Sequence, residues 1–145
     1  MKSNFNDVAL LLLRLAVGAV MWAHGAQKLL GLFGGHGPHG FVRVVVGMGM
    51  PPAMGWLVIA VEFFGGIAVV LGVLSRLAAL GFAVEMAVAV VKIHLANGFF
   101  MNWASVGGRG EGFEYSLVLV AASLTLFLVG PGRYALFGRT RNLLA

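Results

Sequence analysis

The sequence contains no cysteine. This absence excludes disulfides, thiol redox relays, iron–sulfur clusters and heme attachment through cysteine. Charged residues are also scarce, at 10% of the chain, whereas soluble domains carry about 25%. Hydrophobic residues make up 60% of the chain, and its mean hydropathy is +0.96. A composition so poor in charge and so rich in apolar side chains predicts a protein that crosses a membrane several times.

Long apolar segments set the expected architecture. A helix needs about 20 apolar residues to span the hydrocarbon core of a bilayer. Four segments qualify, at about residues 7–31, 54–74, 76–96 and 113–130. The length of 145 residues allows one compact bundle and no separate soluble domain. We therefore predict an all-α membrane protein, an antiparallel four-transmembrane-helix bundle that forms a single domain over residues 1–145.

The connections between these segments differ in character. Arg14 interrupts the first apolar run, and the run continues past Lys28, so we interpret it as a transmembrane helix rather than a cleaved signal peptide. In the Gly-rich stretch that follows, residues 41–49 (FVRVVVGMG) fit either a short interfacial segment or a strand-like patch packed on the bundle. Ser75-Arg76 predicts a tight turn, which makes the second and third helices antiparallel neighbours.

Positive residues lie at the ends of the apolar segments, where they orient helices in a membrane. One side of the predicted bundle carries Lys2, Arg76, Arg133, Arg139 and Arg141, and the other carries Lys28, Arg43, Lys92 and Arg109. This distribution favours both termini in the cytoplasm and the two longer loops facing outward. The net charge of +5 comes without a basic cluster interleaved with aromatic residues, so we expect no nucleic-acid partner.

A stripe of polar residues runs along the first apolar segment. At about 100° per residue, positions spaced three and four apart fall on one face of a helix, and this face carries Arg14, Val17, Met21, His24 and Lys28. Lipid tails cannot solvate the polar side chains of this face, so we expect it to point into the protein.

Carboxylates occur in the second and third apolar segments. A charge in the middle of a bilayer costs at least about 2.5 kcal/mol, so Glu62 and Glu85 must pair, bind a proton or face a polar cavity. Depths estimated at about 1.5 Å per residue let His24 meet Glu62, and place Arg14 within reach of Glu85 if the first and third helices adjoin. We predict Arg14–Glu85 to be a structural ion pair.

Small residues accompany these carboxylates. Gly55 and Gly66 share a face with Glu62, which allows close helix packing or leaves room for a ligand. Glu85 shares its face with Gly81, Ala89 and Lys92.

Two interpretations of the polar residues stay open at this point. The ionisable pairs either only fix the order of the helices, or they form a site that opens outward, because a histidine beside a carboxylate can pass protons.

His36 and His39 are two ligands only, which does not make a metal site, so we predict no metal.

The chain resembles the DoxX family of small bacterial four-helix membrane proteins. The resemblance rests on Arg14 with HGAQKL in the first helix, EFFGGIAVVLGVLSR across the second, KIHLANGFF at the end of the third, and GEGFEYSLVLVAASLTLFLVGPGR in the fourth. The family pattern points to Arg14, His24, Lys28, Glu62, His94, Asn97 and Glu114. After GPGR the chain departs from the expected pattern and reads YALFGR.

The resemblance implies a place in the bacterial inner membrane and in membrane oxidoreductase systems linked to oxidative stress or sulfur metabolism. The expected function is a quinone-linked subunit in which His24, Glu62 and Glu114 are catalytic and Lys28, Asn97 and His94 bind the quinone. No recognisable motif binds another cofactor, so such a subunit needs a soluble or membrane oxidoreductase partner. The alternatives are a non-catalytic anchor for a partner enzyme, and a bundle, homo-oligomeric if necessary, that binds or transports lipids or small molecules.

Overall fold

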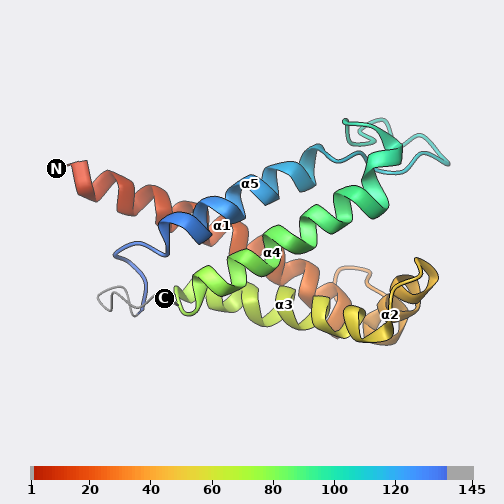
Figure 1. The fold of residues 1–145 in the computed structure, drawn as a ribbon, viewed down its shortest axis with the longest axis horizontal. Coiled ribbons are helices and arrows are strands. Elements are labelled where there is room, and N and C mark those ends of the chain that lie inside the picture. Colours follow the sequence, from red (N-terminus) through yellow and green to blue (C-terminus); the bar gives the residue numbers. More distant parts are fainter. Residues whose placement is uncertain (1, 137–145) are drawn as a thin grey trace.

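The computed structural model describes residues 2–136, and all regular structure in this range is helical (Figure 1). The prediction of an all-helical protein is thereby confirmed. The helices are α1 (Lys2–Leu30), α2 (Gly37–Gly47), α3 (Pro52–Leu71), α4 (Ser75–Ala89), the π-helix η1 (Val90–His94), the 3₁₀ turn η2 (Leu95–Asn97) and α5 (Glu114–Val129).

Three helical stretches are long and apolar enough to cross a membrane. They are Phe5–Leu30, Pro52–Leu71 and Ser75–Asn97, the last of which joins α4 to η1 and η2. The apolar helix α5 is shorter, with 16 residues. The four predicted apolar segments therefore each contain a helix, and three of those helices reach spanning length.

The segment after α1 forms a helix rather than a strand. The sequence of residues 41–49 fits an interfacial segment or a strand-like patch, and the structure places most of these residues in the helix α2. Pro38 lies in the first turn of this helix, where its missing N–H costs nothing. The helix packs on α3, where a Cβ added to Gly55 would come within 3.0 Å of Val42.

A short turn joins α3 to α4. Gly72 ends α3 in the left-handed conformation, with φ of 79°, and the N–H of Val73 donates back to the carbonyl of Ala68 at 2.9 Å. These features are those of a glycine-terminated helix end. The turn lies slightly earlier than predicted, because Ser75 already begins α4.

Glycines let α1 approach α3 closely. A Cβ added to Gly25 would collide with the backbone of Glu62 and Phe63, and one added to Gly66 would lie 2.6 Å from the backbone nitrogen of Trp22. Small residues at such contacts are how membrane helices pack without a hydrophobic driving force. Gly66 thus serves close packing of the two helices.

The core lies where α1, α3, α4 and α5 meet. Its buried side chains include Val17 and Met21 from α1, Val69 from α3, Phe82 from α4 and Leu126 from α5. The face of α1 that was predicted to point inward therefore contributes directly to this core.

Figure 1 shows the start of α1, the α3–α4 turn and the end of α5 at one end of the molecule, and α2 with the loop after η2 at the other. Arg139 and Arg141 lie outside the described residues, as does the end of YALFGR. The antiparallel four-helix membrane bundle and its orientation stay predictions.

The glycine contact between α1 and α3 is testable. We expect Gly25→Ala to lower the free energy of unfolding by about 1–3 kcal/mol, because overpacking a tight contact forces the helices apart. The matched control is Gly47→Ala, since a Cβ added to Gly47 meets nothing within 4 Å. Unfolding in detergent micelles measures both variants, and equal stabilities would contradict the proposed role of Gly25.

Candidate functional site

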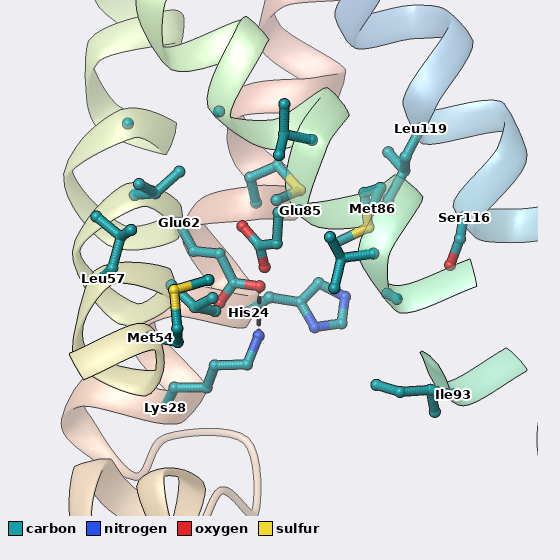
Figure 2. Close-up of a pocket in the computed structure, with 18 of the residues that line it drawn as sticks. His24, Lys28, Met54, Leu57, Glu62, Glu85, Met86, Ile93, Ser116 and Leu119 are labelled. Atoms are coloured by element: carbon teal, nitrogen blue, oxygen red, sulfur yellow. Dashed lines mark hydrogen bonds and ion pairs between the residues drawn. The ribbon is translucent and has the colours of Figure 1, made fainter. Parts of the chain in front are cut away.

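A cavity of about 910 Å³ lies between α3 and α4, with α1 on one side (Figure 2). Its wall is mostly aliphatic. Methionine side chains adapt to differently shaped ligands. The wall also holds every methionine of the chain except Met1, namely Met21, Met48, Met50, Met54, Met86 and Met101. Cavities of this volume and apolar character are typical binding sites for small molecules.

The polar stripe of α1 divides between the core and this cavity. Arg14 and Val17 are buried, Met21 is buried and also borders the cavity, and His24 and Lys28, one and two turns further along, line the cavity. The ring of His24 is exposed to the cavity rather than packed away. The prediction that this face points into the protein is confirmed.

An ion pair joins α1 to α3 inside the site. The ammonium of Lys28 donates a hydrogen bond to Oε1 of Glu62, whose side chain is 1% exposed. Lys28 also lies over the ring of Phe41 from α2, with its nitrogen 4.8 Å from the ring centroid, a geometry that stabilises a cation. Glu62 is therefore buried with its charge matched.

Glu85 of α4 reaches the same place from the opposite wall. Figure 2 shows the side chains of Glu62, Glu85 and His24 pointing into one space from three helices. Oε2 of Glu62 and Oε2 of Glu85 are both buried and have no hydrogen-bond partner among residues 2–136. The site thus holds two buried carboxyl oxygens that a ligand or a proton can satisfy.

The position of the α3–α4 turn explains why these carboxylates meet. Glu62 comes ten residues before Gly72, and Glu85 comes ten residues after Ser75. At 1.5 Å per residue both lie about 15 Å from the turn, so the two arms of the hairpin place them at one level. The two spacings are equal in the sequence, so the common level of the carboxylates follows from the position of the turn.

The predicted Arg14–Glu85 ion pair is wrong. Arg14 lies beside the α3–α4 turn, about 15 Å along α4 from Glu85 by the same rise per residue. Its guanidinium instead donates to the backbone carbonyls of Val70, Pro131 and Tyr134, at 3.2, 2.9 and 3.1 Å. Arg14 therefore ties α1 to the end of α3 and to the segment after α5.

The structure also corrects the expected role of Glu114. This carboxylate is not part of the cavity wall. Its Oε1 accepts hydrogen bonds from the backbone N–H of Met101 and the indole N–H of Trp103, both at 2.9 Å. Since Glu114 opens α5, it folds the preceding loop onto the start of this helix.

His94 and Asn97 attach the same loop to η1 and η2. His94 lines the cavity, and its Nδ1 lies 2.9 Å from the carbonyl oxygen of Glu111. A carbonyl can only accept, so Nδ1 of His94 is the donor in this hydrogen bond. Asn97 donates to the carbonyls of Ile93 and Glu111, both at 3.1 Å, and does not line the cavity.

No group of three or more His, Cys, Asp or Glu residues within residues 2–136 is arranged to hold a metal ion. His39 lies edge-on to the ring of Trp56, with centroids 5.8 Å apart, and so packs α2 against α3.

The model of the DoxX family matches residues 9–95, which is more than half of the chain. The chain belongs to the DoxX family. The resemblance found in the sequence is thereby confirmed, and with it the interpretation as a membrane protein. His24, Lys28, Glu62 and Glu85 all lie inside the matched range, whereas Glu114 lies outside it.

A curated relative of this DoxX chain comes from Bacillus subtilis (strain 168) and is named "Putative oxidoreductase CatD". The two are 28% identical over 126 residues, which cover 87% of this chain and 83% of the relative. No solved structure matches the chain.

The Lys28–Glu62 pair makes a prediction for stability. Lys28→Met leaves Glu62 buried and unpaired, which we expect to lower the free energy of unfolding in micelles by about 3–5 kcal/mol. The double variant Lys28→Met/Glu62→Met removes both charges, and we expect it to regain most of this loss.

Lys92→Met serves as the control. Lys92 lines the same cavity, is exposed and has no ion pair within the described residues, so its loss should cost less than about 1 kcal/mol. A double variant as unstable as Lys28→Met would contradict the pairing.

Proposed function

We propose that this DoxX chain is a quinone-binding subunit of a membrane oxidoreductase system that serves oxidative stress or sulfur metabolism. It would lie in the bacterial inner membrane as an antiparallel four-transmembrane-helix bundle, with both termini in the cytoplasm and the two longer loops outside. The observation that carries the proposal is the apolar cavity between α3 and α4 with a cluster of ionisable side chains in its wall.

The cavity suits the two parts of a quinone. A quinone combines a flat ring bearing two carbonyl acceptors with a long apolar tail. The ring needs hydrogen-bond donors, which the ammonium of Lys28 and the ring of His24 can supply. The aliphatic wall of the cavity suits the tail.

The cavity also supports entry from the bilayer. Leu57 on α3 and Leu77 and Val84 on α4 line it, yet each is more than half exposed on the surface of the molecule. These side chains connect the interior of the cavity with the surface that would face lipid. A ligand dissolved in the membrane can therefore enter between α3 and α4 without crossing water.

His24 and Glu62 are the residues proposed to move protons. His24 faces the cavity, and the buried Glu62 lies beside it. Lys28 orients Glu62 and offers its remaining N–H groups to the ring. His94 borders the cavity and Asn97 holds the loop beside it, so neither is proposed to act on protons.

The electrons that reduce the quinone must come from a partner protein. No recognisable motif of the chain binds a flavin, a redox metal or a thiol pair, so the proposal includes a soluble or membrane oxidoreductase partner. The relative named an oxidoreductase supports placing this chain in such a system.

Mass spectrometry of the lipid extract from gently purified protein tests the proposal. We expect wild-type protein to carry quinone near one per chain. Glu62→Gln should lower the amount by about tenfold, since it removes the charge that holds Lys28 in place. Asp7→Asn is the control, because Asp7 lies near the start of α1, where it accepts the N–H of Arg133, and α1 starts at the end of the molecule opposite α2.

Two results would contradict the proposal. If the Glu62→Gln variant carries as much quinone as the wild type, the quinone does not bind in this cavity. Wild-type protein without quinone that instead retains a partner enzyme would favour a non-catalytic anchor.

A further inference from the structure

The positive and negative charges in the cavity do not cancel if all of its ionisable groups are charged. Glu62 and Glu85 contribute two carboxyls at one level, and the one cation bonded to either of them within the described residues is Lys28. Lys28 gives its bond to Glu62. Two ionised carboxylates beside a single ammonium would leave one negative charge uncompensated inside the membrane.

The other titratable groups of the cavity do not supply this charge. His24 lies beside the two carboxyls, but a neutral imidazole adds none. Lys92 is seven residues beyond Glu85, which is about 10 Å along the helix, and its side chain is exposed. His94 is tied to the carbonyl of Glu111, whose own carboxylate accepts the N–H of Asn102.

One shared proton restores the balance. Two carboxyl groups that face each other in a water-poor site cannot both ionise, so one of them keeps its proton. Glu62 already has an ammonium as its partner. The proton therefore resides on Glu85, whose carboxyl has no cation bonded to it in the part of the chain that the structure describes.

A protonated Glu85 needs an acceptor for its O–H. Its Oε2 is buried and has no hydrogen-bond partner within the described residues, and the side chain lines the cavity. A polar hydrogen left unpaired in such a place is costly. The carboxylate of Glu62, whose Oε2 is also unpartnered within the described residues, can accept this bond, and an oxygen of the molecule that fills the cavity can take its place.

We propose that Glu85 is a neutral carboxylic acid at neutral pH and that it donates a hydrogen bond to a carbonyl oxygen of the bound quinone. The hydrogen bond rests on the proposed function, whereas the proton on Glu85 does not. Glu85 is then the residue that selects a neutral headgroup with an acceptor oxygen, with Glu62 and Lys28 as an internal, charge-neutral pair behind it.

Infrared spectroscopy of the full-length protein in liposomes tests the proton without any ligand. The chain has only five acidic side chains, so a band from a protonated carboxyl can be assigned by substitution. We expect such a band in the wild type at neutral pH, its loss in Glu85→Gln, and its retention in Asp7→Asn and Glu114→Gln. A wild type without the band, or a band that persists in Glu85→Gln, would overturn the assignment.

Titration with a short-chain ubiquinone analogue tests the hydrogen bond. We expect wild-type affinity to fall by about tenfold from neutral to alkaline pH, as the donor is lost. Glu85→Gln keeps an N–H donor at every pH, so its affinity should not change with pH, and Glu85→Ala should bind weakly throughout.

A wild-type affinity that is independent of pH would overturn the hydrogen bond. A wild type that binds no quinone at any pH would overturn the proposed function and this hydrogen bond together, while the infrared band alone would still decide where the proton lies.

Discussion

The carboxylate of Glu62 is the constraint on which the rest of the site depends. A side chain that is 1% exposed cannot keep a charge inside a membrane without a cation. Lys28 supplies it from α1, and it can do so because Gly25 brings the backbone of α1 against that of Glu62 and Phe63. The close contact of two helices and the charge balance of the site are therefore one structural requirement. Phe41 of α2 completes it by covering the ammonium.

The hairpin of α3 and α4 turns this ion pair into a binding site. Its turn sets Glu85 level with Glu62, and Figure 1 shows the two helices separating as they leave the turn. The cavity occupies the space between them. At the turn itself, Arg14 binds three backbone carbonyls from two segments. One end of the hairpin is thus held firmly while the other end leaves room for a ligand, an arrangement that suits a molecule entering from the bilayer.

The sequence predicted what depends on local pattern. Apolar runs located the helices, and the spacing of Arg14, His24 and Lys28 located the inward face of α1. Contacts between helices are harder to predict from the sequence. Arg14 binds carbonyl oxygens, which every residue has, so no sequence signal marks its partners, and a carboxylate in another helix was the obvious choice. The family resemblance points to Glu114 as a site residue, whereas the structure places its partners in an irregular loop whose path no periodicity reveals.

The central claim is that a quinone headgroup binds between α3 and α4 beside Glu62 and Glu85. Photo-crosslinking with an azido-quinone, followed by mapping of the labelled residues, tests it most directly. The account predicts labels on cavity residues of both helices, such as Leu57 and Val84, and little label on the exposed face of α5 at Val118 and Leu128, which do not line the cavity. Labels spread evenly over all exposed apolar faces would mean that the quinone only dissolves in the surrounding lipid, and would contradict the account.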